Sequence, residues 1–157
     1  MPSDRELLEM AIEEARQSVR EGGGPFGAIV VLPGNRELAR GRNRVTLHQD
    51  PTAHAEVIAI RAACQMLGNH RLQGATIYSS TEPCPMCLAA IHWARIDRLV
   101  YGATRHDAAR AGFDDATFYR ELQLPPESRA LPATHLALPS AQVPLDEWVE
   151  LGDKTLY

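Results

Sequence analysis

The stretch Glu82-Pro83-Cys84-Pro85-Met86-Cys87 decides how the rest of the chain is interpreted. Pro85 predicts that a helix begins beside Cys84, because the N–H that proline lacks has no partner in the first turn of a helix. Cys84 and Cys87 then lie one turn apart on the same helix face. The positive end of the helix dipole favours their thiolate forms. Two thiolates placed in this way form half of a tetrahedral metal site, so the other ligands must come from elsewhere in the chain.

The length and composition indicate a single globular domain that spans residues 1–157. The chain has 157 residues, of which 45% are hydrophobic, and no apolar run approaches the ~18 residues of a membrane span. No basic-then-apolar leader is seen, so no secretion signal is expected. Three cysteines in such a chain favour metal binding over a disulfide framework. The net charge of −4 argues against a general nucleic-acid binder.

The first part of the chain alternates between helical and strand patterns. Ser3-Asp4-Arg5-Glu6 has the spacing of a capping box, and apolar residues follow at helical spacing, which predicts an amphipathic helix over residues 4–20. The apolar residues 26–32 predict a buried strand. Residues 33–35 predict a hairpin turn, which leads into a short return strand near residues 37–42.

Arginines recur at alternate positions of this return strand. Alternate residues point to one face of a strand, and these are Arg36, Arg40, Arg42 and Arg44. Because the whole chain is acidic, we expect a solvated edge face there rather than an RNA-binding stripe. Asn43 carries no signal of its own, and a turn asparagine is the default interpretation.

A second helix is expected to open within Asp50-Pro51-Thr52-Ala53-His54-Ala55-Glu56. Asp50 or Thr52 can cap this helix. Apolar side chains between residues 57 and 67 predict that it is well buried. His54 is then expected in its first turn. A lone histidine there would usually be a capping or core residue, but Glu56 follows two positions later and the cysteine pair lies downstream, so His54 is a candidate ligand.

Two strands are predicted on either side of the helix that starts at Cys84, at residues 75–80 and 96–101. A strand–helix–strand order implies parallel pairing through a right-handed crossover. The predicted fold class is therefore α/β, with a mixed sheet between helices. Sites in such sheets form where helices begin, outside the C-terminal ends of the strands. Both groups of candidate ligands lie at helix starts, which supports their convergence.

The C-terminal part is expected to be less regular. A loop and a short helix at residues 116–121 lead into a proline-rich connector and tail at residues 124–157. We expect one edge strand at residues 134–138. A short helix at residues 145–151 is expected to bury Trp148.

His54, Cys84 and Cys87 are the donor types that zinc prefers, and three protein ligands leave one position for water. We expect one Zn²⁺ per chain. Two thiolates and a neutral imidazole leave the centre formally neutral, so bound water can lose a proton near pH ~7, against a pKa of ~15.7 in bulk water. Glu56 is the candidate shuttle that passes this proton to a leaving amine. H-x-E followed by P-C-x-x-C is the signature of the zinc deaminases.

Each half of this signature is weak alone, because C-x-x-C also occurs in redox and structural zinc sites. A structural zinc site would need a fourth Cys or His. Cys64 lies about two and a half helical turns past His54, where it is poorly placed to be that ligand, and we expect a core thiol. A thioredoxin-like pair would not explain His54 and Glu56. The remaining alternative to a zinc hydrolase is a non-catalytic zinc-stabilised binding module, which would not need Glu56.

These residues resemble the cytidine deaminase superfamily and, within it, the bacterial guanine deaminases. The resemblance covers nearly all of the chain. It is carried by Gly24-Pro25-Phe26-Gly27-Ala28, Asp50 to Glu56, Glu82 to Leu88, Trp93-Ala94-Arg95 and Ala111-Gly112-Phe113-Asp114-Asp115. The last of these stretches, together with Tyr157, points to the guanine branch. Thr81 departs from the family, where a cysteine is expected, but this position is not a ligand.

The resemblance implies a three-layer α/β/α fold with a mixed central sheet, and the hydrolysis of guanine to xanthine and ammonia in purine catabolism. Asn43 and the backbone N–H of Ala55 would hydrogen-bond the purine base. Phe26 and Trp93 would pack on its ring. Asp115 would accept protons from guanine's edge and join Glu56 in catalysis. An ionised carboxylate is a pure acceptor, so adenine, which lacks the N1 donor, would leave it unpaired.

The resemblance also implies a cytoplasmic homodimer with an exchanged C-terminal segment. Tyr157 would then reach the partner's pocket, and the proline-rich connector would act as the hinge. From the residues alone, Tyr157 would be a frayed end. Asp114 and Asp115 would likewise be a helix-capping pair.

Other substrates of a zinc deaminase stay open, namely cytosine, a triazine such as ammeline, and tRNA adenosine. The tRNA enzymes carry a basic C-terminal region. This tail instead has Asp146, Glu147, Glu150 and Asp153 against Lys154, which argues against a tRNA substrate. Ammeline shares the amino-amide edge of guanine and is harder to separate from it.

Overall fold

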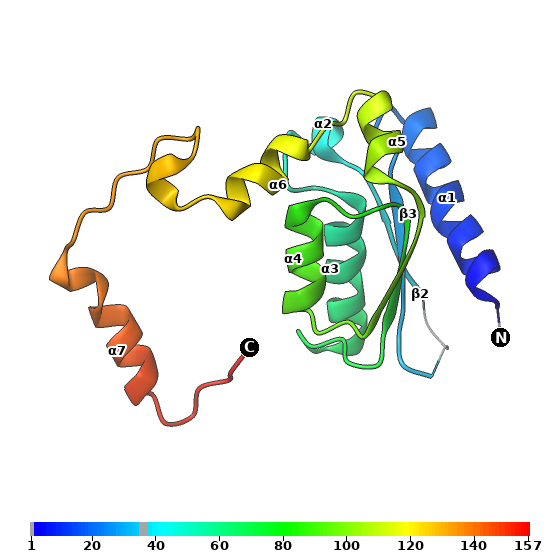
Figure 1. The fold of residues 1–157 in the computed structure, drawn as a ribbon. Helices are drawn as coiled ribbons and strands as arrows, with labels where there is room; N and C mark the ends of the chain where they lie inside the picture. The colour runs from blue at the N-terminus through cyan, green and yellow to red at the C-terminus, as the bar shows by residue number, and fades with distance from the viewer. Residues whose placement is uncertain (1, 35–37) are drawn as a thin grey trace. The chain divides into compact units, whose positions relative to one another are not determined.

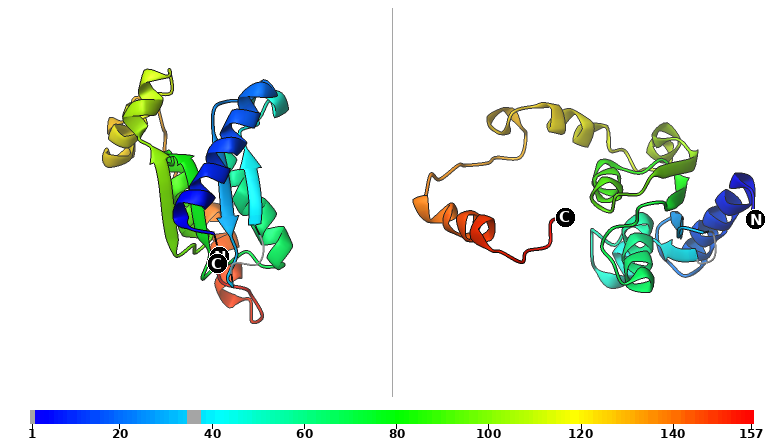
Figure 2. Two further views of the ribbon diagram at one scale, coloured as in Figure 1. Left: turned by 90° about the vertical axis from the view of Figure 1, so that its right-hand side faces the viewer. Right: turned by 90° about the horizontal axis from the view of Figure 1, so that it is seen from below.

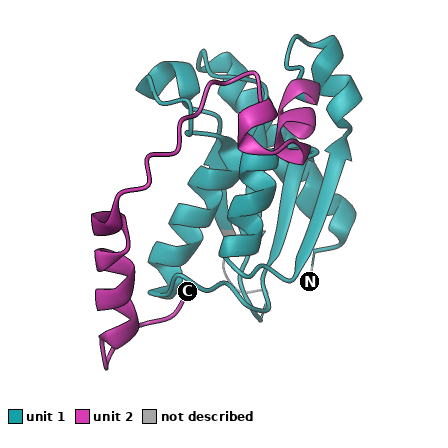
Figure 3. Ribbon diagram, turned by 60° about the vertical axis from the view of Figure 1, so that its left-hand side comes forward, with its two compact units in different colours: residues 1–115 teal, residues 116–157 magenta. Residues whose placement is uncertain are grey.

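The computed structural model describes residues 2–34 and 38–157. Two compact units make up the chain, residues 1–115 and residues 116–157 (Figure 3). The first unit contains the sheet and the residues of both zinc-deaminase motifs. Among the described residues, no helix has the length and apolar character needed to span a membrane.

The first unit is built on one mixed sheet of four strands, in the order β2-β1-β3-β4 (Figure 1). These are β1 (Gly27–Val31), β2 (Leu38–Arg42), β3 (Thr76–Thr81) and β4 (Arg98–Ala103). β1 pairs antiparallel with both β2 and β3, whereas β3 and β4 are parallel. The mixed sheet and the parallel pairing across the second motif are confirmed. The predicted hairpin turn and the start of the return strand lie partly outside the described residues.

Helices α3 (Ala55–Leu67) and α4 (Pro85–Trp93) cover one face of the sheet. The side chains of Ala28 and Val30 point to this face, where they join Ala59 of α3 in the larger buried cluster. This face is apolar because side chains alternate along a strand. Both motif helices therefore share one core, which brings their starts to the same region of the sheet.

Helix α1 (Asp4–Arg20) covers the opposite face, as Figure 2 shows. Leu7 and Ala11 of α1 pack with Ile29 and Val31 of β1 in a second buried cluster. The predicted capping box is present, since Ser3 Oγ accepts from the backbone N–H of Glu6 and the Glu6 carboxylate accepts from the backbone N–H of Ser3. The three-layer α/β/α fold is confirmed.

Two glycines let the helices approach the sheet closely. A Cβ atom at Gly41 would lie 2.0 Å from the carbonyl oxygen of Ala55, and one at Gly27 would lie 2.3 Å from that of Ala11. Real Cβ atoms do not come so near to backbone, so only glycine fits at either position. Gly41 thereby fixes the first residue of α3 against β2.

The start of α3 differs from the prediction. The helix begins at Ala55, and His54 is its N-cap residue with extended backbone angles (φ −72°, ψ 152°), so His54 does not lie in the first turn. Asp50 and Thr52 do not cap α3. The Asp50 carboxylate instead accepts from the backbone N–H of Thr52 at 2.8 Å and so closes a turn before the helix.

Two short helices were not predicted, α2 (Val45–His48) and α5 (Arg105–Arg110). Helix α5 starts with a capping box formed by Thr104 and Asp107, a pattern that the sequence contains. β4 also begins two residues later than the predicted strand at 96–101.

The second unit contains α6 (Ala116–Gln123), the 3₁₀ turns η1 (Pro126–Ser128) and η2 (Pro139–Ala141), and α7 (Val143–Glu150). The helices at both ends of the predicted connector are confirmed. The predicted edge strand at 134–138 is wrong, because these residues pair with no strand among the described residues. The prediction that this tail helix buries Trp148 is also wrong. Its side chain is 39% exposed, and its ring lies 6.4 Å from that of Tyr157.

Candidate metal centre and active site

Three side chains of the two motifs meet at the starts of α3 and α4. His54 is the N-cap of α3, Cys84 is the N-cap of α4, and Cys87 lies in the first turn of α4 behind Pro85. The Nδ1 atom of His54 lies 3.5 Å from Cys84 Sγ and 3.4 Å from Cys87 Sγ. The three potential ligand atoms all lie within 4.8 Å of one another. The predicted convergence of the two motifs is confirmed.

These distances fit a tetrahedral zinc ion. Zinc bonds of about 2.3 Å to sulfur and about 2.0–2.1 Å to nitrogen put the two donor atoms about 3.6 Å apart at a tetrahedral angle. The measured separations of 3.5 and 3.4 Å are within a few tenths of an ångström of that value. Two thiolates and an imidazole are also the donor types that zinc prefers. The structure therefore provides three protein ligands for zinc.

The electrostatics of the cysteine pair favour metal binding. A hydrogen bond from Cys87, and a second one with His54, lower the pKa of the Cys84 thiol to about 4 although burial opposes this. The same contact with Cys84 raises the pKa of the Cys87 thiol, and burial and the Glu56 carboxylate raise it further. The pKa of His54 is raised by its hydrogen bond with Cys84. These groups lie so close together that a divalent cation would relieve the repulsion between two thiolates.

Glu56 lies directly beside this ligand set. It is in the first turn of α3 and is only 5% exposed. One carboxylate oxygen accepts a hydrogen bond from Ser79 Oγ at 2.9 Å, and the other accepts from Cys87 Sγ at 3.2 Å. Burial raises the pKa of Glu56, against the opposing effect of these hydrogen bonds. A buried carboxyl group with a raised pKa is suited to taking up and releasing protons near neutral pH.

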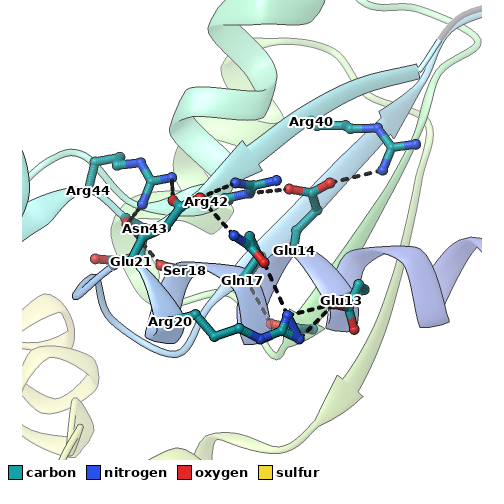
Figure 4. Close-up of polar contacts among 12 residues, drawn as sticks. Glu13, Glu14, Gln17, Ser18, Arg20, Glu21, Arg40, Arg42, Asn43 and Arg44 are labelled. Atoms are coloured by element: carbon teal, nitrogen blue, oxygen red, sulfur yellow. Dashed lines mark hydrogen bonds and ion pairs between the residues drawn. The ribbon is translucent and has the colours of Figure 1, made fainter.

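Asn43 follows β2, is 5% exposed and lies beside Ser18 and Arg44 (Figure 4). Its Oδ1 accepts from the backbone N–H of Gly24 at 3.3 Å and from that of Val45 at 3.2 Å. Its carbonyl oxygen accepts from the buried hydroxyl of Ser18 at 3.0 Å. The two N–H donors fix the orientation of the carboxamide. Its Nδ2 group has no acceptor among the described residues and can donate to a bound molecule.

The arginines of β2, and Arg44 just after it, form ion pairs with α1 and with Glu21, the C-cap residue of α1 (Figure 4). Arg40 and Arg42 contact the Glu14 carboxylate at 2.9 and 2.5 Å, and Arg42 and Arg44 also contact Glu21. Burial would raise the pKa of Glu14, but the arginines outweigh burial and hold this pKa below its usual value. The expectation of a merely solvated face is therefore wrong for Arg42 and Arg44, and Arg36 lies outside the described residues. The paired charges leave no open basic stripe on the described part of β2.

The loop between α5 and α6 carries an aromatic contact and a carboxylate. The rings of Phe26 and Phe113 meet edge to face, with centroids 4.9 Å apart. Asp115 is half-buried, whereas Asp114 is exposed. Burial raises the pKa of Asp115, and the negative charge of Cys84 adds to this. Asp115 therefore lies close enough to Cys84 for the charge of that residue to affect its pKa.

The other three residues singled out from the sequence differ in their surroundings. Ala55 is fully buried at the first position of α3, where a backbone N–H has no partner within the helix. Trp93 ends α4 and is 61% exposed. Tyr157 belongs to the second unit. Sequence reasoning missed Ser79, which no motif marks and which only the fold brings to Glu56.

Comparison with known proteins identifies the family. The model of the cytidine and deoxycytidylate deaminase zinc-binding region matches residues 1–103. Guanine deaminase of Bacillus subtilis is 46% identical over 152 residues, which covers 96% of this chain and 97% of that protein. A tRNA-specific adenosine deaminase of Agrobacterium fabrum is 50% identical over 97 residues, which covers 62% of this chain and 63% of that protein.

The fold leads to the same group of proteins. The X-ray structure of guanine deaminase from Bacillus subtilis superposes with a TM-score of 0.94 at 44% identity, and the match covers 100% of this chain and 99% of that one. The sequence match, the fold and the ligand geometry agree. The chain belongs to the family of zinc-dependent deaminases that contains the cytidine and deoxycytidylate deaminase zinc-binding region.

Proposed function

We propose that this chain hydrolyses guanine to xanthine and ammonia, with one zinc ion per chain held by His54, Cys84 and Cys87. The observation that carries the proposal is the buried carboxylate of Glu56 beside these ligands, in a chain 46% identical to a guanine deaminase over 96% of its length. Similarity to the tRNA-specific adenosine deaminase covers only 62% of the chain. The free thiols of the described residues suit a reducing compartment, and we place the reaction in the cytoplasm.

Bound zinc supplies Lewis acidity, which makes a water molecule nucleophilic near neutral pH. In the overall reaction an oxygen from water bonds to C2 of guanine, and the bond from C2 to its amino nitrogen breaks. The departing amine needs a proton to leave as ammonia. Glu56 is suited to carry that proton from water, because it is buried beside the ligands and its pKa is raised by burial.

The surrounding groups suit the edges and faces of guanine. The Nδ2 group of Asn43 donates to an acceptor of the purine, and the backbone N–H of Ala55 offers a second donor. Asp115 accepts from the N1 and amino donors of guanine. We assign this role to Asp115 rather than to Asp114 because Asp115 is half-buried and because the charge of Cys84 adds to the rise in its pKa. Adenine lacks the N1 donor and would leave this carboxylate unpaired, which discriminates strongly against it.

Aromatic side chains would cover the ring of the base. Phe26 is half-buried and is held from the side by the ring of Phe113. Trp93 ends α4 and is 61% exposed, and its aromatic ring is of the type that packs on a base. Stacking on apolar rings adds binding energy without discriminating among purines. Specificity would therefore rest on Asn43 and Asp115.

The second unit would complete the site through exchange between the subunits of a homodimer. Its large apolar side chains are widely exposed, and among them are Phe118 at 58%, Leu122 at 66%, Leu131 at 76%, Val149 at 69% and Tyr157 at 69%. Apolar surface of this extent indicates a protein partner. The prolines between α6 and α7 supply a stiff connector, and Tyr157 would reach the partner's pocket. Loss of activity without loss of folding on deletion of Tyr157 would support this assignment, whereas a monomer at full activity would contradict it.

The experiment that tests the proposed function follows ammonia release and product mass for guanine, cytosine, adenosine and ammeline, using purified zinc-loaded protein. We expect guanine to have the highest kcat/KM and xanthine to be its product. A higher value for ammeline would assign the same chemistry to a triazine. Turnover of none of the four compounds would contradict the proposed function. Glu56→Ala, loaded with zinc to the same level, is the control for contaminating deaminases.

A further inference from the structure

A buried serine on β3 contacts the proposed proton shuttle. Ser79 is 1% exposed, and its Oγ lies 2.9 Å from Glu56 Oε1 and 2.6 Å from the carbonyl oxygen of Thr81. We propose that Ser79 is a positioning residue that holds the Glu56 carboxylate in its reactive orientation. This inference rests on the proposed function of Glu56 but does not depend on which base is the substrate.

The first argument concerns the donors that reach Glu56. A carboxylate that is 5% exposed cannot rely on bulk water for hydrogen bonds, so its orientation depends on nearby protein donors. The side-chain donors to Glu56 among the described residues are the Ser79 hydroxyl and the Cys87 thiol. Cys87 can donate only as a thiol, and a thiolate that binds a metal has no proton to give. Ser79 keeps its hydroxyl proton whether or not a metal is bound, so it can donate to Glu56 in both cases.

The second argument concerns the single proton of the Ser79 hydroxyl. Two acceptors lie within reach, Glu56 Oε1 and the Thr81 carbonyl oxygen, and the hydroxyl can donate to only one at a time. A hydrogen bond to a carboxylate is stronger than one to a neutral carbonyl oxygen. The hydroxyl is therefore held between the two acceptors, and its contact with Glu56 fixes one carboxylate oxygen.

Ser79→Ala tests this role, and Ser80→Ala is the matched control. Ser80 is the next residue of β3, is 7% exposed and accepts from the backbone N–H of Gly27 at 3.1 Å. Its side chain points to the opposite face of the sheet from Ser79, because side chains alternate along a strand. The two variants therefore make the same chemical change in the same strand, but only one of them removes a contact to Glu56.

We expect Ser79→Ala to lower kcat about tenfold or more, since a hydrogen bond to a charged group is lost, while KM changes less than about threefold. Zinc content should stay at one per chain by elemental analysis. The thermal midpoint should fall no further than that of Ser80→Ala, whose kcat should stay within about threefold of wild type. Ser79→Thr keeps the hydroxyl and should recover most of the lost kcat.

Three results would overturn the inference. They are a wild-type kcat for Ser79→Ala, a loss of kcat that Ser80→Ala matches, and a loss of kcat that accompanies loss of zinc. If Ser79→Ala does not fold, Ser79→Val, which has the shape of Ser79→Thr without its hydroxyl, replaces it, and a wild-type kcat there contradicts the role equally. All ratios are measured on whichever base the wild-type protein turns over. A wild-type protein that is inactive on guanine but active on another of the four compounds refutes the proposed substrate, and the ratios measured on that compound still decide the role of Ser79.

Discussion

Replacing Asn43 with aspartate isolates one hydrogen-bonding group of the proposed base-binding site. Asn43 Oδ1 accepts from the backbone N–H groups of Gly24 and Val45 at 3.3 and 3.2 Å. An aspartate oxygen can accept from the same two donors, so the loop should keep its conformation. The second carboxylate oxygen then stands where Nδ2 was. The Nδ2 donor of Asn43, which we propose to hydrogen-bond the purine base, is thus replaced with an acceptor, and the shape of the side chain changes little.

The size of the effect follows from the burial of this side chain. Asn43 is 5% exposed, so water cannot replace the lost donor. Losing the hydrogen bond costs about 1 kcal/mol, and leaving an acceptor of the base unpaired against a carboxylate costs about 1–3 kcal/mol more. The total of about 2–4 kcal/mol corresponds to a kcat/KM for guanine that is roughly 30-fold to 1,000-fold lower.

The assay compares initial rates of ammonia release with thermal unfolding of the same preparations. Asn69→Asp is the matched control, because Asn69 Oδ1 also accepts from a backbone N–H, that of Arg71 at 2.9 Å, on an exposed turn. The control should keep its activity. The reasoning fails if Asn43→Asp retains kcat/KM within about threefold of wild type while remaining folded, since its Nδ2 group would then not contact the base.

Three further predictions follow from the same contacts. Glu56→Gln should bind zinc but have a kcat that is roughly 10²–10⁴-fold lower, as expected for a lost proton shuttle. Substantial turnover by the zinc-loaded variant would show that Glu56 is not the shuttle. Asp115→Asn should lower kcat/KM for guanine at least about tenfold, whereas Asp114→Asn should have little effect, and equal losses would indicate a structural role for the loop. Glu14→Gln should lower the free energy of unfolding by about 1–3 kcal/mol near pH 7, because the charge that pairs with Arg42 is lost. The pKa of Glu14 is held below its ordinary value of 4.5, so this stabilisation is present above that pH and is lost as the pH falls through the lowered pKa. Urea unfolding of the variant and the wild type measures the difference at each pH. A difference that is as large at about pH 3 as at pH 7 would contradict the assignment.

The metal ligands and the helices that carry them could be predicted because their signals are local. Pro85 next to Cys84 predicts a helix start, and the structure has Cys84 as the N-cap and Pro85 in the first turn of α4. The H-x-E pattern placed His54 and Glu56 together, and the packing of α3 and α4 in one core on the same face of the sheet brought them to the cysteines. Such features depend on residue types at short spacing, which a single sequence contains.

The features that could not be predicted depend on contacts between distant segments. Ser79 became a candidate only when the register of β3 placed it 2.9 Å from Glu56, which lies 23 residues earlier. The start of α3 was misplaced because Asp50 can close a turn as readily as it can cap a helix. Trp148 has the apolar character of a core residue, yet it is 39% exposed, because residue type alone does not say which segments pack against a side chain.

The most direct test of the central claim is a zinc titration of ammonia release from guanine. Protein stripped with a chelator should be inactive, and activity should rise linearly with added Zn²⁺ until it levels off at one ion per chain. Cys87→Ser, which replaces a buried ligand, should need far more zinc to reach any activity. Full ammonia release by protein with no stoichiometric metal, or a metal-loaded protein that releases none, would contradict the account.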